Sequence, residues 1–439
     1  MVAHAAPRRA HRTGVQMPQD APYASVIVPT YNRSALLSVT LASLELQNVP
    51  PGSFEVVVAD DGSSDDTEAV VEGFAGRGPV RYAFQEDLGH RPAAARNTGA
   101  RQARGDVLIF LDTGTLAGPG FVRSHVEAVT AADPERARKA VLGYTYGYNP
   151  WQIPEALRPL VAELTPEQIV DRLGREPGFR DMRHDTLDAV GDDLRRVHLP
   201  WMLFWTMNVS LAARDFRAVG GFDEDFQGWG CEDSEFAYRL SSAGLDFVVS
   251  RDAWAIEAPH DRDLAGIGGS VAKNSALMWS KHPVPAMEMH WGIQGNGFYE
   301  PPLEEAYAAF ARWRAQTARQ ATAAEVSETV ERHRPSLAPA GSVLVVGADR
   351  DFVPPPGALR WTALCPDGDL PSPRAEVAMD HAIGLRTTYQ DQSFDLVVLT
   401  SRLAGLWPSW GELLQREANR LGRAVAVTPR LREALAPGA

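Results

Sequence analysis

The sequence of 439 residues has few cysteines, no long apolar run and no block of basic residues. Its two cysteines, Cys231 and Cys365, are too few for a disulfide framework or a thiolate metal cluster, and they are compatible with a reducing compartment. No stretch of about 18 apolar residues occurs, and no apolar signal-peptide core follows the N-terminal arginines. We therefore expect a cytoplasmic protein that is neither membrane-spanning nor exported by a standard signal.

The charge balance is acidic, with 43 Lys and Arg against 56 Asp and Glu and a formal net charge of −13 at pH 7. The basic residues form no run that could follow a phosphate backbone, so nucleic acid is not expected as a partner. An apolar fraction of 44% and a charged fraction of 23% are typical of globular proteins. Because the chain is longer than one hydrophobic core usually supports, we expect two domains.

Short apolar runs alternate with helical patterns from Tyr23 onward, which predicts an α/β fold with a largely parallel sheet covered by helices. Residues 1–22 are rich in Ala, Arg and His without hydrophobic periodicity, and we interpret them as a flexible tail. The predicted strands are residues 25–29, 55–60, 80–85, 107–112 and 247–256, and the predicted helices are residues 34–47, 65–74 and 92–104.

Polar residues follow three of these strands at the point where each strand ends. Ligands of open α/β sheets bind at the carboxyl ends of the strands, so we expect a binding site at this edge. A carboxylate there can accept hydrogen bonds from a nucleobase or a ribose hydroxyl. The polar residues are Thr30, Tyr31 and Asn32 after the first strand, Asp60 and Asp61 after the second, and Asp112 after the fourth.

A second α/β pattern begins at Gly341, after a segment rich in Ala, Glu and Arg that reads as helical. Its predicted strands are residues 342–347, 394–400 and 424–427. The charged residues 150–200 carry no clear motif, and we assign them to acceptor recognition. The predicted organisation is a tail at residues 1–22, a main domain at 23–300, a helical linker at 301–338 and a smaller domain at 339–439.

Two motifs follow the first two predicted strands: Pro29-Thr30-Tyr31-Asn32-Arg33 and, one helix and one strand later, Asp60-Asp61-Gly62-Ser63. With these motifs the sequence resembles the inverting glycosyltransferases of family 2, which have the GT-A fold. The resemblance covers about residues 24–283 and implies a mixed, mostly parallel sheet that binds a nucleotide sugar. The implied nucleoside pocket consists of Pro29, Tyr31, Asn32, Arg33, Asp60 and Asp61. Taken alone, the second segment is also compatible with a turn before an N-capped helix.

Four further residues carry the predictions for the donor diphosphate and a metal ion. Arg96, in Arg96-Asn97-x-Gly99, matches a family motif, and its planar guanidinium can neutralise the diphosphate or pack on the base. Asp112 and Thr113 stand where the family has Asp-x-Asp, which implies donor contact and a divalent ion, Mn²⁺ or Mg²⁺. Family members often have a His at the position of His260, which implies a ligand of the metal ion or of the diphosphate. Gly114 departs from the pattern, because it replaces the second carboxylate.

The segment from Asn208 to Leu240 resembles the acceptor side of the family, with Gly-Gly-Phe-Asp followed by Trp-Gly-x-Glu-Asp at a helix start. The resemblance implies that Asp233 is the general base and that Glu232 binds or orients the acceptor. A carboxylate of ordinary pKa, about 3.9, is ionised at neutral pH and can take the acceptor proton. Trp229 offers a flat face to a sugar ring, or is a core aromatic.

The strands predicted at residues 342–347 and 394–400 look similar to the first and fourth strands of class I methyltransferases. The glycine-rich cofactor loop is reduced to Gly347, so a degenerate Rossmann-like domain for packing, dimerisation or covering the acceptor site fits better than methyl transfer. A homodimer is therefore one expectation. A non-catalytic nucleotide-sugar-binding scaffold and a bifunctional methyltransferase are the alternatives to a transferase.

The predicted reaction is transfer of a sugar, with inversion, from a UDP-hexose or another nucleotide sugar to a hydroxyl of a small-molecule or glycan acceptor. The composition resembles that of proteins from high-GC actinobacteria, in which related enzymes glycosylate aminocyclitols in secondary metabolism and antibiotic biosynthesis. A glucosyltransferase of the validoxylamine type is one hypothesis.

Overall fold

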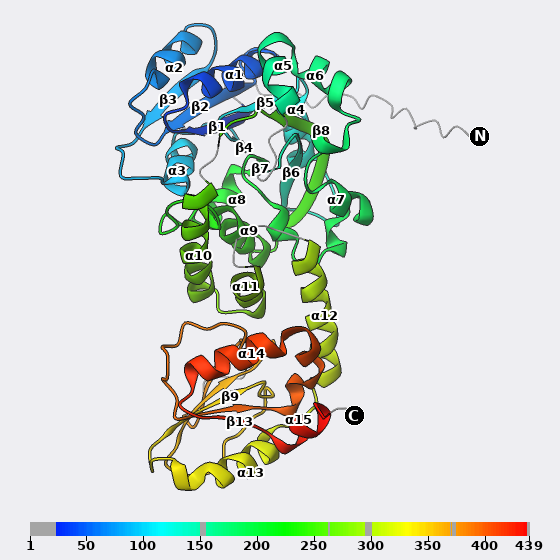
Figure 1. Ribbon diagram of the computed structural model, residues 1–439. Helices are drawn as coiled ribbons and strands as arrows, with labels where there is room; N and C mark the ends of the chain where they lie inside the picture. Colours follow the sequence, from blue (N-terminus) through cyan, green and yellow to red (C-terminus); the bar gives the residue numbers. More distant parts are fainter. Residues whose placement is uncertain are drawn as a thin grey trace, which may run out of the picture. The chain divides into compact units, whose positions relative to one another are not determined.

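The structure is a computed structural model that describes residues 23–149, 155–261, 264–294, 301–368, 370 and 375–436. The predicted N-terminal tail therefore lies outside the described residues, as do residues 150–154 of the segment assigned to the acceptor. The chain divides into two compact units (Figure 1). The first unit comprises Met1–Leu194, Phe204–Asp223 and Phe236–Asp261, and the second comprises Arg195–Leu203, Glu224–Glu235 and Arg262–Ala439.

The first unit is built on an eight-stranded mixed sheet with the order β3-β2-β1-β4-β7-β6-β8-β5. Strands β1 to β4 are parallel to one another, β7 is antiparallel to both β4 and β6, and β5 is antiparallel to β8. The α/β class and the mixed sheet are thus confirmed. The strands are β1 Ala24–Thr30, β2 Phe54–Asp60, β3 Val80–Phe84, β4 Val107–Leu111, β5 Thr115–Ala117, β6 Lys139–Tyr146, β7 Asn208–Ala212 and β8 Asp246–Glu257.

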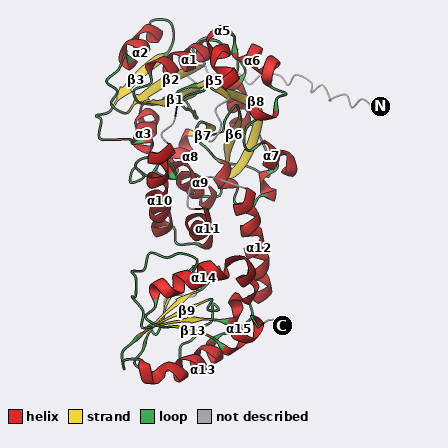
Figure 2. Cartoon of the chain, viewed as in Figure 1, coloured by secondary structure: helices red, strands yellow, loops and turns green. Residues whose placement is uncertain are grey.

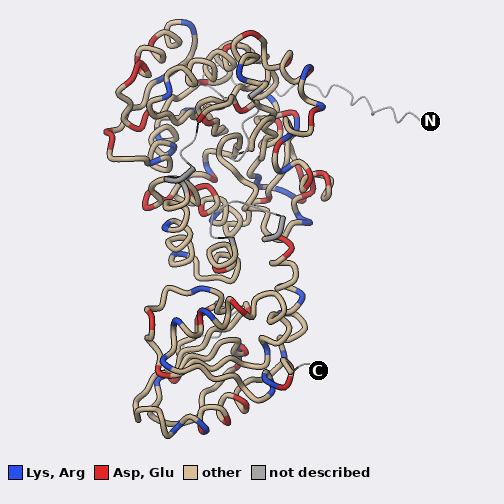
Figure 3. The backbone as a smooth tube through the Cα atoms, viewed as in Figure 1, with Lys and Arg blue, Asp and Glu red and all other residues tan. Residues whose placement is uncertain are grey.

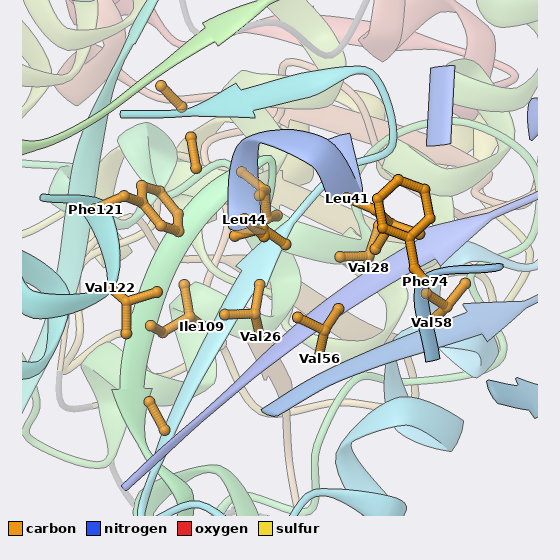
Figure 4. Packing of buried hydrophobic residues seen from close by; sticks show 14 of the residues in the cluster. Val26, Val28, Leu41, Leu44, Val56, Val58, Phe74, Ile109, Phe121 and Val122 are labelled. Carbon is orange, nitrogen blue, oxygen red and sulfur yellow. The ribbon is translucent and has the colours of Figure 1, made fainter. Parts of the chain in front are cut away.

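Helices cover both faces of this sheet because its strands are apolar on both sides. Alternate strand residues such as Val26, Val56 and Ile109 pack against α1, α2 and α4 on one face, and Figure 4 shows this packing. The opposite face receives α3, whose Gly99 lies against Ile27. The helices are α1 Ser34–Glu45, α2 Thr67–Ala75, α3 Pro92–Gln102, α4 Phe121–Thr130, α5 Arg158–Glu163, α6 Pro166–Leu173, α7 His184–Val190, α8 Ala213–Ala218 and α9 Glu232–Ser242.

Six strands of the first unit end at the same edge of the sheet. Strands β1 to β4 run in one direction, and β6 and β8 share it because both β4 and β6 are antiparallel to β7. The last residues of β1, β2, β4, β6 and β8 are Thr30, Asp60, Leu111, Tyr146 and Glu257. The sequence segments predicted to bind the donor follow the first three of these strands, so the topology places them along one edge.

A polar network lies inside the first unit, between α4 and β7. His125 is fully buried, and its two ring nitrogens lie 2.8 Å from Ser210 Oγ and 2.8 Å from Asn208 Oδ1. The Asn208 amide donates to the carbonyl oxygens of Tyr144 and Ala253, beside the irregular register between β6 and β8. Burial lowers the pKa of His125 to about 4, against a weaker raising effect of its bond to Asn208.

We expect acid to destabilise the first unit through His125. Because the pKa is about 6.5 in the unfolded chain and about 4 in the folded one, the stabilisation is present above pH 6.5 and is lost as pH falls toward 4. The loss amounts to about 3 kcal/mol. Denaturant unfolding across this range should show the stability advantage of the wild type over His125→Gln shrinking as pH falls. An advantage that stays constant would contradict the assignment.

The second unit contains a five-stranded, all-parallel sheet with the order β11-β10-β9-β12-β13. Figure 2 shows α14 on one side of this sheet and α13 with α15 on the other. The strands predicted at residues 342–347, 394–400 and 424–427 are confirmed as β9, β12 and β13. The strands are β9 Ser342–Val346, β10 Arg360–Leu364, β11 Ala378–Asp380, β12 Leu396–Leu399 and β13 Val425–Val427; the helices are α10 Leu264–Lys281, α11 Pro285–Met289, α12 Pro301–Thr317, α13 Ala323–His333, α14 Trp407–Leu421 and α15 Pro429–Ala434.

The described residues show neither a block of basic side chains nor a membrane-spanning helix. Lys and Arg residues are interspersed with Asp and Glu along the backbone rather than gathered in one block (Figure 3). Among the described residues, no helix is both long enough and apolar enough to cross a membrane. The domain limits predicted at residues 300 and 338 stay predictions.

Candidate active site

The loops after β1 and β2 are joined to each other by hydrogen bonds. Asn32 adopts a left-handed conformation with φ of 49°. Its Oδ1 accepts from the Ser64 N–H at 2.8 Å, and its own N–H donates to Ser63 Oγ at 2.8 Å. Asp65 Oδ2 accepts from the Ser34 N–H at 2.9 Å, at the start of α1. The two motifs that carry the family resemblance therefore form one structural unit.

Asp60, the last residue of β2, and Asp61, which follows it, both point into the protein interior. Asp60 is 1% exposed and accepts hydrogen bonds from the Ser63 N–H at 2.8 Å and the Tyr82 hydroxyl at 2.6 Å. Asp61 is 3% exposed and accepts from the Gln85 side chain at 2.6 Å and the Arg91 N–H at 2.7 Å. The carboxylates of both predicted nucleoside ligands thus hold the segments after β2 and β3 in place.

The exposed rim of this region contains a Tyr–Asp pair. Tyr31 is 37% exposed, and its hydroxyl donates to Asp87 Oδ2 at 2.9 Å. This hydrogen bond and the charge of Asp87 raise the pKa of Tyr31. Gly62, with φ of 92°, lies so close to the Asp87 backbone that a Cβ would be 2.4 Å from its nitrogen. Only glycine fits there, so the turn presents Tyr31 and Asp87 together.

Helix α3 connects the sheet to the Gly-Gly-Phe turn of the first unit. The Asn97 amide donates to the Phe222 carbonyl at 2.9 Å, and its Oδ1 accepts from the Phe222 N–H at 2.9 Å. A Cβ on Gly99 would lie 2.6 Å from Ile27, so glycine allows the helix to approach β1 closely. Arg239 of α9 donates to the carbonyl oxygens of Val219 and Gly221, which holds the same turn from its other side.

Arg96 and Asp112 form an ion pair at the end of β4. Arg96 Nη2 lies 2.9 Å from Asp112 Oδ1, and the side chains are 5% and 37% exposed respectively. The guanidinium also lies over the Phe222 ring, 5.7 Å from its centroid. Thr113 Oγ1 donates to the Pro29 carbonyl at 2.7 Å, which ties the Asp112 turn to the loop after β1. The structure therefore brings together these four predicted donor residues: Pro29, Arg96, Asp112 and Thr113.

The Asp112 turn offers the predicted divalent ion one carboxylate in place of two. Gly114 stands in the position of the second carboxylate with φ of 94°, and a Cβ there would point at Leu36, 3.6 Å away. His260, from the segment after β8, has Nδ1 at 3.1 Å from the Ala258 carbonyl oxygen. Within the described ranges, no three His, Cys, Asp or Glu side chains gather as a metal site. The metal site predicted at Asp112 and His260, which has two protein ligands, stays a prediction.

The second unit carries the strained turn that precedes α9. Gly228 and Gly230 have φ of 80° and 91°, and Cys231 is a non-glycine residue with φ of 74°. The Asn274 amide of α10 donates to the carbonyl oxygens of Gln227, at 3.1 Å, and Gly230, at 2.8 Å. A buried Cys231 thiol lies 3.6 Å from Ser275 Oγ, and burial raises its pKa to about 12. Backbone strain held by such contacts is typical of functional sites.

Helix α9 begins at Glu232, as the sequence predicts, so Glu232 and Asp233 both lie in its first turn. Glu232 is 7% exposed, and Asp233 is half-buried. Asp233 Oδ1 accepts from the Ser234 N–H at 2.7 Å, which orients the carboxylate. The positive end of the helix dipole favours the ionised form of both side chains. Trp229, in the turn itself, is half-buried, and Arg33 at the start of α1 is exposed.

Several residues that fix these loops, in one unit or the other, have no predicted role in the sequence. Asp87 and Asn274 lie in segments without a motif, and Asn97 belongs to a motif in which only Arg96 has a predicted role. The partners of these residues lie far away in the sequence: Asn97 and Phe222 are 125 positions apart, and Tyr31 and Asp87 are 56 apart. Their roles therefore become visible only in the folded chain.

Known families match two parts of the chain. Glycosyl transferase family 2 matches residues 25–165, and the N-terminal domain of galactosyltransferase matches residues 190–259. The validoxylamine A glucosyltransferase of Streptomyces hygroscopicus subsp. limoneus is 43% identical over 411 residues, which cover 92% of this chain and 90% of the relative. The enzyme of the same name from S. hygroscopicus subsp. jinggangensis is 43% identical over 94% of this chain and 98% of its own length.

A crystal structure of Staphylococcus aureus TarS 1–349 in complex with UDP-GlcNAc has a TM-score of 0.42 and 19% identity, and it covers 65% of this chain and 69% of that one. The two Streptomyces relatives and the family 2 match, which spans β1 to β6, establish the family. The chain belongs to glycosyltransferase family 2, and it is a glycosyltransferase that uses a nucleotide sugar.

Proposed function

We propose that this enzyme transfers a hexosyl group, with inversion, from a UDP-hexose such as UDP-glucose to a hydroxyl of an aminocyclitol acceptor of the validoxylamine type. The observation that carries the proposal is the pair Glu232 and Asp233 in the first turn of α9, after a strained turn fixed by Asn274. The names of the two relatives that are 43% identical support the glucosyl group and the acceptor class.

In this reaction Asp233 is the general base. The acceptor oxygen forms a bond to the anomeric carbon while the bond from that carbon to the diphosphate oxygen breaks, and its electron pair leaves with the diphosphate. The proton of the acceptor hydroxyl passes to the Asp233 carboxylate as the new bond forms. Glu232 holds a neighbouring acceptor hydroxyl, and Trp229 offers an aromatic face to the acceptor ring.

The donor nucleotide binds along the edge where β1, β2 and β4 end. Tyr31, Asn32 and Arg33 form the rim beside the nucleoside, and Asp60 and Asp61 act by fixing the loops that contact it. Asp112 is half-exposed and accepts from a ribose hydroxyl, and Arg96 lies beside it for the diphosphate. Pro29 and Thr113 hold the two loops together. All these segments and α9 fall within residues 23–300, which we propose as the transferase domain.

Calorimetric binding of UDP, GDP and dTDP, each with Mn²⁺, Mg²⁺ or a chelator, tests the donor site. We expect one nucleotide to bind, UDP first among them. Transfer from UDP-glucose to validoxylamine A, with the anomeric configuration of the product determined by NMR, then tests the acceptor and inversion. If a folded protein binds none of the nucleotides under any condition, the donor-site assignment fails and the scaffold alternative is favoured.

The structure of the second unit argues against the methyltransferase alternative. In open parallel sheets a cofactor binds beyond the carboxyl ends of strands such as β9 and β12. Here a Cβ on Gly347 would lie 2.7 Å from Thr400 Oγ1 and 2.9 Å from Leu403. Arg402, fully buried, lies 2.8 Å from Asp367 Oδ1 in the same region. Side chains of the protein thus lie close to the carboxyl ends of β9 and β12. We propose a degenerate Rossmann-like packing domain, and S-adenosylmethionine binding in the same calorimetric series would overturn that proposal.

A further inference from the structure

The backbone at Gly114 disfavours the second carboxylate of an Asp-x-Asp motif beside Asp112. The turn requires φ of 94° at Gly114, a conformation that side chains other than glycine rarely adopt. Gly114 is also fixed by its neighbours, since its N–H donates to Thr40 Oγ1 and its carbonyl accepts from the Ala258 N–H. Any side chain built there starts against the apolar Leu36. The backbone, and not only the missing side chain, therefore departs from a two-carboxylate metal site.

A cationic side chain already lies at Asp112. Arg96 is held on α3, where the adjacent Asn97 is locked to the Phe222 backbone by two hydrogen bonds. Its guanidinium is 2.9 Å from Asp112 Oδ1 and 5% exposed, so it is a fixed positive charge rather than a mobile surface group. A divalent ion bound to the same carboxylate would lie within a few ångströms of this charge and be repelled by it. The Arg96 guanidinium thus already neutralises the Asp112 carboxylate, which disfavours the binding of a divalent ion there.

Loss of the sugar increases the negative charge of the nucleoside diphosphate as its bond to the anomeric carbon breaks. This charge has to be neutralised in the site, and fixed donors in a partly buried environment do this effectively. Arg96 is the cation that the structure brings to the Asp112 turn, and a guanidinium matches two phosphate oxygens in one plane.

We propose that Arg96, and not a divalent ion, neutralises the leaving diphosphate, so that transfer proceeds without metal. The inference rests on the proposed function, because it concerns the diphosphate of the same donor. It assigns to Arg96 a contact with the leaving group in the reacting state, and it gives Asp112 a role in holding Arg96 and the ribose.

The test measures donor turnover and UDP affinity for the wild type, Arg96→Gln, Arg96→Lys and Gly114→Asp, in chelator and in Mn²⁺. We expect wild-type turnover in chelator to stay within about twofold of that in Mn²⁺, and Arg96→Gln to lower kcat by about 100-fold with no rescue by Mn²⁺. Arg96→Lys keeps the charge but loses the planar fork, so we expect a smaller loss. Gly114→Asp should gain no metal dependence.

Arg101→Gln is the matched control, since Arg101 lies on the exposed side of the same helix. It should keep wild-type turnover, and thermal unfolding of each variant checks that the fold is kept. Wild-type turnover that disappears in chelator and returns with Mn²⁺ overturns the inference but leaves the transferase proposal intact. Absence of both turnover and nucleotide binding in every condition would instead overturn the proposed function.

Discussion

Replacing Asp233 by Asn is expected to lower kcat by about 10²- to 10⁴-fold, with the fold and the affinity for UDP unchanged. The substitution keeps the size and polarity of the side chain, but an amide cannot accept the proton of the attacking hydroxyl. The amide oxygen can still accept the 2.7 Å hydrogen bond from the Ser234 N–H, so the helix start should be retained. Single-turnover measurements of sugar transfer, with UDP binding followed by calorimetry, give the result.

Asp225→Asn is the control for this experiment. Asp225 lies in the same segment, is 70% exposed and pairs with Lys281, so the loss of its charge should change kcat by less than about twofold. Glu232→Gln should act differently, mainly by raising KM for the acceptor, because its proposed role is to bind rather than to accept the proton. Near wild-type turnover of Asp233→Asn would remove Asp233 from the mechanism.

The strands of the first unit could be predicted because their apolar residues are continuous and turn residues bound them. The limits predicted for β1, β2 and β4 agree with the structure to within one residue at each end. The predicted helix at residues 65–74 begins at Thr67 instead, because Asp65 accepts a hydrogen bond from the Thr67 N–H and belongs to the preceding turn. Such ends depend on side-chain contacts that periodicity does not contain.

The site was predicted less completely, since burial and orientation are set by tertiary contacts. Sequence alone placed Asp60 and Asp61 at a strand end, but not the hydrogen bonds to Tyr82, Gln85 and Arg91 that turn both carboxylates inward. The sequence also predicted Arg96 as a ligand of the diphosphate and Asp112 as a ligand of the donor and the metal ion, without a link between the two residues. Their ion pair, which bears on the metal prediction, arises only when α3 and the end of β4 lie together.

In the second unit, strands β10 and β11 also depend on tertiary contacts that the sequence pattern does not contain. These short segments were not predicted, and β11 has only three residues, two of them half-buried and one exposed. A strand of this kind is specified by the neighbour that it pairs with, here β10 in parallel, rather than by its own hydrophobic pattern. Long-range pairing therefore determines the edge of the sheet.

Replacing Glu288 by Ala is expected to destabilise the second unit by about 4 kcal/mol, the largest effect on stability that we predict. Glu288, on α11, is fully buried, and its carboxylate accepts hydrogen bonds from four consecutive backbone N–H groups at residues 383–386, at distances of 2.5 to 3.3 Å. Alanine would leave these donors buried without an acceptor. The Arg386 guanidinium, 4.6 Å from the Trp291 ring centroid, holds the same loop.

Denaturant unfolding and amide hydrogen exchange at residues 383–386 measure the effect. Glu288→Gln keeps one acceptor oxygen, so its loss of stability should be intermediate between those of the wild type and Glu288→Ala. Glu328→Ala, at a side chain that is 54% exposed on α13, should cost less than about 1 kcal/mol although it also removes an ion pair. If Glu288→Ala is as stable as Glu328→Ala and the four amides keep their protection, the carboxylate does not hold this loop, and the apolar contacts of α11 must do so instead.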